Sequence, residues 1–306
     1  MIKIIKASES IIISQLILVI YGQPGIGKST LGFTAENPLL LDFDKGAYRA
    51  ANRQDIVPIT SWADATQISE KDLLPYKTVI VDTVGRALDF ITASLLKENS
   101  KWNFNGALTL QGYGILKSRF TTWLNTLKIM GKDVVLIVHS SEEKKGDEFL
   151  ERLDVQGGSK SEIYKQADAM GRIYIENKIR MISFSPTDTA FGKNPANLDV
   201  LQIPNVSENS LFLAELIFSI KDSLNKMTEE QKIRQEKINK WGKEISSAKS
   251  ASDFNDLVNK SQKADQDIIQ IIKGMIHKTA TDSGFLYEKN KGYIEAEIQE
   301  PVGVAQ

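Results

Sequence analysis

The stretch LILVIYGQPGIGKST, residues 16–30 of this 306-residue chain, decides the fold. Its first six residues show no polar alternation, as in a strand that is buried on both faces of a sheet. From Gly22 the sequence matches G-x-x-x-x-G-K-[ST], in which glycines allow a tight turn and backbone N–H groups converge on phosphate oxygens. The helix expected after this turn directs its positive N-terminal end at the same anion. The stretch therefore predicts a strand, a phosphate-binding P-loop and a helix.

Two side chains of the P-loop have separate chemical tasks. Lys28 places a positive charge between the β- and γ-phosphates, and the Ser29 hydroxyl is a ligand for Mg²⁺. The sequence thus predicts nucleoside-triphosphate binding, with ATP and Mg²⁺ as cofactors. The expected nucleotide contacts are Gly22, Gln23, Pro24, Gly25, Ile26, Gly27, Lys28, Ser29 and Thr30.

Two later apolar runs end in carboxylates. The run TVIVD ends at Asp82, which we expect beside the P-loop at the carboxyl edge of the sheet, where it holds Mg²⁺ together with Ser29. The run LLLDFD contains Asp42 and ends at Asp44. A carboxylate at a neighbouring strand end can orient the water that attacks the γ-phosphate. We assign this role to Asp44 with support from Asp42, and turn formation at the end of the strand is the alternative.

Short apolar runs alternate with helical patterns as far as residue 220. This alternation predicts an α/β domain, residues 1–220, with a mostly parallel central sheet. A β-hairpin at the edge of the sheet is expected from residues 172–175 and 179–184. The other expected strands span residues 16–21, 39–43, 78–81 and 133–138, and the expected helices span residues 28–35, 62–74, 84–96 and 113–130.

Residues 221–306 lack such strand-like runs and predict a mainly helical C-terminal extension. Thr228-Glu-Glu-Gln231 has the form of a capping box, which predicts that a helix begins there. Apolar residues recur at spacings of three and four on both sides of Ser250-Ala-Ser252, as in a helical hairpin with one apolar face. That face is either the core of the hairpin or a groove for a partner. Residues 285–287 and 293–298, around Asn290-Lys-Gly292, predict a terminal β-hairpin.

The composition excludes several classes of protein. With 38 Lys and Arg against 39 Asp and Glu, the net charge is -1, so overall positive charge cannot hold nucleic acid. The chain has no cysteine and two histidines, which excludes disulfide scaffolds, thiol catalysis and metal sites built from these residues. The most apolar stretch, residues 11–21, is too short to span a bilayer. We therefore expect a soluble cytoplasmic protein with no membrane partner.

The order of the motifs resembles that of the RecA-like ATPases. The matching segments are residues 22–29, 41–44, 79–83, 134–140 and the pair Gly157-Gly158. The phrases LLLDFDKG at residues 39–46 and ADAMGRIY at residues 167–174 resemble more closely the phage Sak-type single-strand annealing ATPases.

This resemblance, which spans residues 12–195, implies a RecA-like P-loop core. It also implies DNA-stimulated ATP hydrolysis by a ring or filament of identical subunits. The implied partners are single-stranded DNA and a single-strand binding protein. A phage-encoded protein of this kind would act in the host cytoplasm.

The resemblance assigns roles to individual residues as well. The catalytic carboxylate of the family falls on Asp44, where the family's recombinase has a glutamate. The polar residue that senses the γ-phosphate falls on His139 or Ser140. His139 thus joins Lys28, Asp44 and Asp82 as a catalytic candidate.

The same resemblance places two DNA-binding loops at residues 97–111 and 141–157. Both loops mix cations with aromatic residues, as single-strand binders do for the backbone and the stacked bases, and ordinary solvated loops are the alternative. The residues concerned are Lys101, Trp102, Phe104, Lys144, Lys145, Phe149 and Arg152. For Trp102 and Phe104, packing into the core is a further alternative.

Other side chains are candidates for completing the nucleotide site. Tyr48 and Arg49 are candidates for stacking on the adenine, with packing under the sheet as the alternative for Tyr48. The RecA-like resemblance implies that a neighbouring subunit contributes a cation. Candidates for that cation are Lys178, Arg180 and Lys193.

The function that these observations favour is ATP hydrolysis by an oligomer that anneals or pairs single-stranded DNA in phage recombination or replication. One alternative is a RecA-fold DNA helicase or helicase loader. Another is a module that binds DNA under nucleotide control without hydrolysing ATP. A nucleoside or small-molecule kinase is least favoured, since the sequence has no evident cluster of basic residues for a lid.

Overall fold

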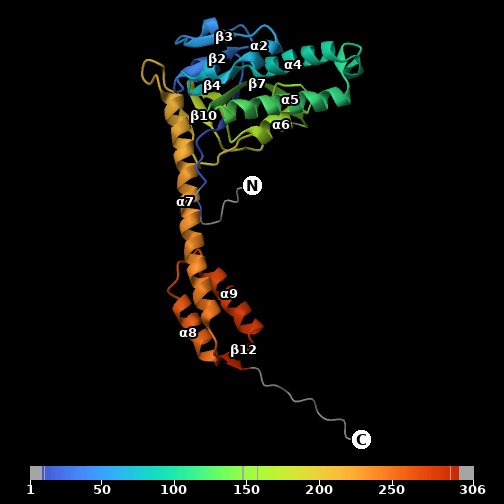
Figure 1. Ribbon diagram of the computed structural model, residues 1–306. Coiled ribbons are helices and arrows are strands. Elements are labelled where there is room, and N and C mark those ends of the chain that lie inside the picture. Colours follow the sequence, from blue (N-terminus) through green and yellow to red (C-terminus); the bar gives the residue numbers. More distant parts are fainter. Residues whose placement is uncertain (1–8, 10, 147, 157, 290, 296–306) are drawn as a thin grey trace. The chain divides into compact units, whose positions relative to one another are not determined.

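The apolar run before the P-loop forms strand β1 (Ile17–Gly22), and each of its residues is buried. The computed structural model (Figure 1) describes residues 9, 11–146, 148–156, 158–289 and 291–295. In it, β1 lies between two parallel neighbours. These are β7 (Asp133–Lys145) and β9 (Ala169–Glu176). Burial on both faces explains why this segment of the sequence is continuously apolar.

The central sheet is mostly parallel, as expected. Among the described residues, nine strands form it, eight of them in the order β11-β10-β9-β1-β7-β4-β2-β3, while β8 pairs with β7 off this path. The hairpin of β9 and β10 is antiparallel, and the short β11 continues the sheet beyond it. The remaining strands are β2 (Pro38–Asp42), β3 (Asp55–Pro58), β4 (Thr78–Asp82), β8 (Glu148–Leu153), β10 (Ile179–Ser183) and β11 (Leu201–Gln202). The expected α/β fold with a mostly parallel central sheet is thereby confirmed, and the strand order is consistent with a RecA-like P-loop core.

Helices cover both faces of this sheet. One face packs on α2 (Trp62–Gln67), α4 (Val84–Glu98), α5 (Leu110–Ile129) and α6 (Ser159–Gln166). The other face packs on α1 (Lys28–Gly32) and on the first turns of α7 (Phe212–Ser247). The two apolar cores therefore hold the strands in place from above and below, and the strand ends stay accessible at the edge.

All four expected helices differ from the prediction in their bounds. Helix α4 ends two residues later than expected, and α5 begins three residues earlier. The helix after the P-loop ends at Gly32 and not at residue 35. The helix expected over residues 62–74 is divided into α2 and α3 (Glu70–Leu73). Ser69 and Asp72 form a second capping box that restarts the helix, and this local signal interrupts a continuous apolar pattern.

The second expected DNA loop, residues 141–157, is largely not a loop. Strand β7 continues to Lys145 and pairs with β8 in an antiparallel ladder from Ser140 opposite Leu153 to Lys145 opposite Glu148. Gly157 lies outside the described residues. The first expected loop, residues 97–111, contains a 3₁₀ turn at Ser100–Trp102 and the short pair β5 (Asn103–Phe104) and β6 (Ala107–Leu108).

The expected helix start at Thr228 is wrong. Helix α7 already begins at Phe212 and passes through this position without a break. The Thr228 hydroxyl donates to the Asn225 carbonyl at 2.8 Å, as serine and threonine do inside helices. The earlier start follows from packing, because Leu213 and Ile220 are fully buried in the core that α7 shares with the sheet.

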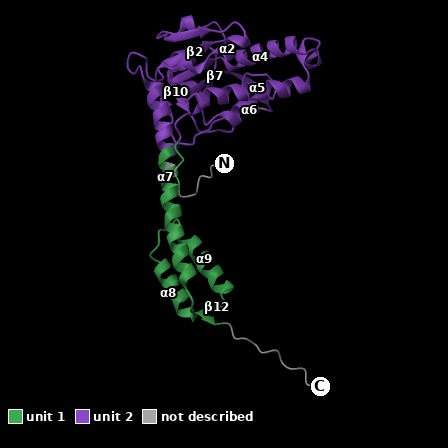
Figure 2. Ribbon diagram, viewed as in Figure 1, with its two compact units in different colours: residues 1–12, 225–306 green, residues 13–224 purple. Residues whose placement is uncertain are grey.

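The chain divides into two compact units, residues 13–224 and residues 225–306 with the first twelve (Figure 2). In the second unit, α8 (Ala251–Ser261) and α9 (Ile269–Asp282) replace the single helix expected after Ser252. The strands β12 (Phe285–Glu288) and β13 (Gly292–Glu295) form an antiparallel hairpin. Residues 290 and 296–298 of the expected hairpin lie outside the described residues.

The apolar face of this helical unit forms its own core. Phe254 is fully buried, with ring centroids 5.3 Å from Phe285 and 5.8 Å from Tyr293. Ile272 and Ile276 are buried in the same cluster. Of the two interpretations of this apolar stripe, the structure favours the core. No helix in the described part of the chain is both long and apolar enough to cross a membrane.

A buried carboxylate joins three segments of the first unit and provides a test of the fold. Asp133, which is 2% exposed, accepts a hydrogen bond from the Leu16 backbone at 3.0 Å and pairs with Lys221 of α7 at 2.5 Å. Asp133→Ala leaves a mostly buried ammonium group and a buried N–H without a partner. We expect the free energy of unfolding to fall by about 3–5 kcal/mol.

Chemical denaturation monitored by tryptophan fluorescence measures this change. Asp199→Ala, which removes an exposed carboxylate, is the matched control and should shift stability by no more than about 0.5 kcal/mol. A loss below about 1 kcal/mol for Asp133→Ala would show that Asp133 does not hold these segments together.

Candidate nucleotide-binding site

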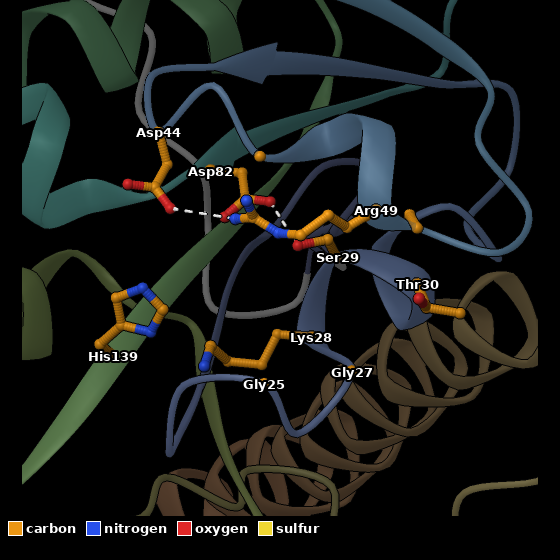
Figure 3. A pocket seen from close by; sticks show the side chains of 11 residues that line it. Gly25, Gly27, Lys28, Ser29, Thr30, Asp44, Arg49, Asp82 and His139 are labelled. Atoms are coloured by element: carbon orange, nitrogen blue, oxygen red, sulfur yellow. Dashed lines mark hydrogen bonds and ion pairs between the residues drawn. The ribbon is translucent and has the colours of Figure 1, made fainter.

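The P-loop lines a pocket of about 300 Å³ at the carboxyl edge of the sheet (Figure 3). Parallel pairing brings the strand ends to this edge, since Gly22 lies opposite His139 and Asp42 lies opposite Asp82. The lining residues are Gly25, Gly27, Lys28, Ser29, Thr30, Asp44, Gly46, Arg49, Ala50, Asp82 and His139. All four residues predicted to be catalytic are therefore found around one cavity.

The three glycines of the P-loop are required for two different reasons. Gly25 and Gly27 have φ angles of 78° and 93°, in the left-handed region that favours glycine. Gly22 ends β1, and a Cβ atom there would lie 2.6 Å from the Ile173 carbonyl oxygen of β9. The first two thus shape the turn, and the third lets the neighbouring strand approach.

Lys28 lies within the P-loop and is 4% exposed. Its Nζ donates to the carbonyls of Gly22 and Gln23, both at 2.8 Å. Burial lowers the pKa of Lys28 to about 8, although the carboxylates of Asp82 and Asp44 oppose this shift. At neutral pH the side chain still carries the positive charge that a triphosphate requires.

Ser29 and Asp82 are in direct contact, which places the two oxygen ligands of the predicted Mg²⁺ site side by side. The Ser29 hydroxyl donates to Asp82 Oδ2 at 2.6 Å. Burial raises the pKa of Asp82 to about 6, with the Ser29 hydrogen bond opposing the shift and the charge of Asp42 adding to it. A hydroxyl and a carboxylate are the hard oxygen ligands that Mg²⁺ takes alongside phosphate oxygens, so the side chains fit this ion.

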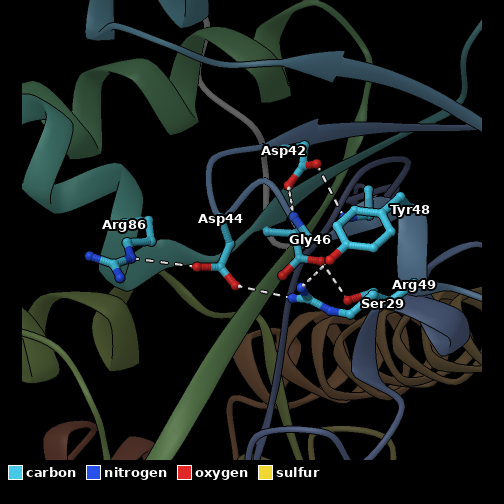
Figure 4. A network of polar contacts seen from close by, with 9 residues as sticks. Ser29, Asp42, Asp44, Gly46, Tyr48, Arg49 and Arg86 are labelled. Carbon is cyan, nitrogen blue, oxygen red and sulfur yellow. Dashed lines mark hydrogen bonds and ion pairs between the residues drawn. The ribbon is translucent and has the colours of Figure 1, made fainter.

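Asp42 and Asp44 have different environments although they are two residues apart. Asp42 accepts hydrogen bonds from the backbone N–H groups of Gly46 and Ala47 at 3.0 and 3.1 Å, so it forms the turn that follows β2 (Figure 4). Turn formation, the alternative considered from the sequence, thus describes Asp42. Asp44 lines the pocket, where one of its oxygens pairs with Arg49 at 4.0 Å, while its other oxygen pairs with Arg86 at 3.5 Å outside the pocket lining.

His139 lies at the end of the buried part of β7, on the wall of the pocket. Among the described residues, its Nδ1 atom is buried and has no hydrogen-bond partner. Burial, and then the charge of Lys28, lower the pKa of His139, so the imidazole is neutral at pH 7. A neutral ring with an unpartnered nitrogen is available to a phosphate or a water. Ser140, the other sensor candidate, pairs with Leu153 of β8.

Of the two adenine-stacking candidates, Arg49 lines the pocket, whereas Tyr48 is not among its lining residues. Tyr48 is 69% exposed, so it does not pack under the sheet. The Arg49 guanidinium lies over its ring at 5.1 Å from the centroid.

Two of the three candidates for a cation from a neighbouring subunit have partners within their own chain. Arg180 Nη1 lies 2.5 Å from where a Cβ atom of Gly27 would stand, and its Nη2 donates to the Pro204 carbonyl at 3.2 Å. Lys193 donates to the Ala167 carbonyl. Lys178 occupies the left-handed turn between β9 and β10, with a φ angle of 64°.

Arg86 was not found from the sequence. It lies in the first turn of α4, four residues after Asp82. A basic residue so close after the strand that ends in Asp82 was the feature of the sequence that could have indicated it. Its contact with Asp44 depends on the neighbouring strand β2, which no local pattern specifies.

Together these features define a class of protein. A buried strand, a turn with two left-handed glycines and a serine bonded to the carboxylate of a nearby strand form the P-loop nucleotide site. The family model AAA_24, described as an AAA domain, matches residues 14–196. The chain therefore belongs to this family of P-loop ATPases.

Two similar proteins cover parts of the chain. One is a protein of Bacillus subtilis (strain 168) named SPbeta prophage-derived uncharacterized protein YorG, which is 31% identical over 140 residues. That match covers 42% of this chain and 42% of the relative, so the chain spans less than half the length of that protein. The other, a solved structure of an ATPase domain, has a TM-score of 0.37 and 12% identity over 64% of this chain and 84% of that one.

The two shifted pKa values predict how nucleotide affinity depends on pH. Below pH about 6, Asp82 takes up a proton and loses its affinity for Mg²⁺, and above pH about 8, Lys28 loses its proton and its attraction for phosphate. We expect the affinity for Mg²⁺–ATP to be highest between these values and to fall up to about tenfold per pH unit on the acidic side.

Titration of a fluorescent ATP analogue from pH 5 to pH 9, with Mg²⁺ present, measures this profile. Asp82→Asn is the matched control, because it keeps the shape of the side chain and leaves the titration of ATP itself unchanged. In the wild type, the fall in affinity at acidic pH has two sources, protonation of Asp82 and protonation of ATP itself. We expect Asp82→Asn to keep only the part that comes from ATP. An identical acidic limb in both proteins would contradict the assignment of Asp82.

Proposed function

We propose that this protein hydrolyses ATP as an oligomer and acts on single-stranded DNA in phage recombination or replication, by annealing or pairing strands. The prophage origin of the curated relative and the resemblance to the Sak-type ATPases support the phage setting. The observation that carries the DNA-binding part is the course of β7. This strand runs from the buried sheet, past His139 at the pocket, into the exposed β7–β8 hairpin.

In this proposal each site residue has one task. Lys28 binds the β- and γ-phosphates, Ser29 and Asp82 hold Mg²⁺, Asp44 orients the attacking water and His139 senses the γ-phosphate. Bound Mg²⁺ would supply neutralisation of the charge on the phosphates. Because β7 carries both His139 and the hairpin, a change at the γ-phosphate reaches the hairpin through one continuous strand.

The hairpin carries cations beside aromatic rings, together with the carboxylates of Glu142, Glu143, Glu148 and Glu151, so any contact with single-stranded DNA is local to those cations and rings. The Lys144 ammonium lies 6.0 Å from the Phe149 ring centroid, and the Arg152 guanidinium lies 4.6 Å from that of Phe191. Phe149 is 58% exposed, so its ring is available for stacking. Alternation of cations with accessible aromatic rings suits phosphates and stacked bases.

A separate cavity adjoins this surface. It has a volume of about 400 Å³ and lies between β8, α6 and the segment that contains Phe191. The rings of Tyr164 and Phe191 are 5.9 Å apart at its wall, and Lys160 and Lys165 lie at its rim. We assign it to an unpaired base. In the first loop Trp102 packs against the core, which leaves the 69% exposed Phe104 as that loop's stacking candidate.

Asp44→Asn tests hydrolysis. The amide keeps the shape of the side chain but cannot accept a proton from water or attract it as strongly. We expect turnover of ATP to fall by about 100-fold or more while ATP affinity stays near that of the wild type. Lys28→Ala is the contrasting variant and should lose ATP affinity as well. Unchanged turnover in Asp44→Asn would contradict the water-orienting role.

Reversal of charge on the hairpin tests the DNA site. We expect the double variant Lys144→Glu and Lys145→Glu to lower affinity for single-stranded DNA by about tenfold or more, because two phosphate contacts become repulsive. The same substitutions at the exposed Lys240 and Lys243 of α7 give an equal change of net charge and should have little effect. Fluorescence anisotropy of a labelled oligonucleotide, with and without ATP, measures both.

Strand-annealing and unwinding assays on one preparation then separate an annealing protein from a helicase. Equal loss of DNA affinity in both double variants would show that the hairpin is not the binding surface.

A further inference from the structure

A second polar cavity lies on the other side of Asp44 and His139 from the nucleotide pocket. Its volume is about 490 Å³, and Arg86, Asp89, Asp154 and Gln156 are among the residues that line it. The two cavities share Asp44 and His139, which therefore separate them. The contacts that Asp44 makes in this polar cavity therefore determine whether its carboxylate is available in the nucleotide pocket.

A continuous set of polar contacts leads from Asp44 to the base of the β7–β8 hairpin. Arg86 Nε lies 3.5 Å from Asp44 Oδ1 (Figure 4), and the Nη1 atom of the same guanidinium lies 3.3 Å from Asp89 Oδ2. The other oxygen of Asp89 accepts a hydrogen bond from the Gln156 amide. Gln156 follows β8 by three residues, and Thr92 donates to its carbonyl oxygen at 3.3 Å.

We propose that Arg86, Asp89 and Gln156 form a relay that restrains Asp44 until the β7–β8 hairpin binds its ligand. This inference rests on the proposed function, in which the hairpin binds single-stranded DNA and Asp44 orients water. Arg86, Asp89 and Gln156 act through Asp44 and are positioning residues.

The relay works by competition for one guanidinium group. The carboxylates of Asp44 and Asp89 both attract the Arg86 guanidinium. The Gln156 amide donates a hydrogen bond to one oxygen of Asp89, which weakens the attraction of Asp89 for Arg86. When DNA draws the hairpin and Gln156 away, Asp89 becomes a stronger partner for Arg86. Arg86 then leaves Asp44, whose carboxylate is free to turn toward water at the γ-phosphate.

The exposure of the relay suits an exchange of partners. The side chain of Arg86 is 59% exposed and that of Asp89 is 46% exposed. Exposed ion pairs contribute little stability individually, so a modest movement of the hairpin can shift the balance between two of them. Arg49, which pairs with the other oxygen of Asp44, lines the nucleotide pocket and keeps the carboxylate near that side.

Two variants with opposite expected effects test the relay. Gln156→Ala releases Asp89 in the absence of DNA, so we expect DNA-free turnover of ATP to rise about fivefold or more, toward the DNA-stimulated rate of the wild type. Asp89→Asn removes the competing charge, so Arg86 stays on Asp44 and stimulation by DNA is lost. The KM for ATP should remain near the wild-type value in both variants.

One matched control lies outside the relay, and a further variant acts on Thr92, which donates a hydrogen bond to Gln156. Gln166→Ala removes a glutamine of α6 that bonds to Glu162, and it should leave both rates unchanged. Thr92→Val loosens Gln156 without removing it and should raise DNA-free turnover in the same direction as Gln156→Ala. A general loss of structure would lower turnover, so the expected rise cannot come from damage to the fold.

The outcomes separate the relay from the proposed function. If DNA stimulates the wild type but Gln156→Ala does not exceed the wild-type DNA-free rate, the relay is overturned and the proposed function stands. If DNA leaves the wild-type rate unaffected while Gln156→Ala is faster, the restraint on Asp44 stands and its release by DNA is overturned. Absence of hydrolysis in all of these proteins would overturn both.

Discussion

The parallel register of four buried strands is the constraint on which the rest of the site depends. Parallel neighbours end at the same edge of a sheet, and here β1 ends at Gly22 opposite His139 while β2 ends at Asp42 opposite Asp82. A shift by one residue would turn each side chain to the opposite face. The apolar cores on both faces resist that shift, and they thereby fix the distance between Ser29 and Asp82.

The parts of the molecule that could be predicted from the sequence are those specified locally or by burial. The P-loop has a fixed spacing, and Asp82 ends a run that is apolar because both its faces are covered. The β7–β8 hairpin could not be predicted in this way, because the exposed end of β7 is the polar run SSEEKK and the buried Leu150 and Leu153 of β8 do not alternate with period two. The predicted helix start at Thr228 was wrong for the opposite reason. The capping-box pattern is complete there, but the packing of Leu213 and Ile220 in the core makes the helix begin earlier.

The charged side chains around Asp44 show a second limit of the sequence. Asp42 and Asp44 are the same residue type two positions apart in the sequence. In the structure, Asp42 accepts hydrogen bonds from backbone N–H groups, whereas Asp44 pairs with two arginines from different elements. Only the pairing of β2 with β4 brings Arg86 within reach of Asp44. Contacts that depend on sheet order in this way have no signature in a single sequence. Here such a contact sets the surroundings of Asp44 beside the P-loop.

The hydrogen bonds of Lys28 have a consequence for the kinetics of nucleotide capture. The ammonium group is already held by the carbonyls of Gly22 and Gln23, and the left-handed glycines already have the conformation that the turn requires. An arriving phosphate therefore exchanges one set of partners for another and orders no backbone, so little conformational entropy is lost on binding. The on-rate for nucleotide should accordingly be limited by diffusion and desolvation of the anion, and not by folding of the loop.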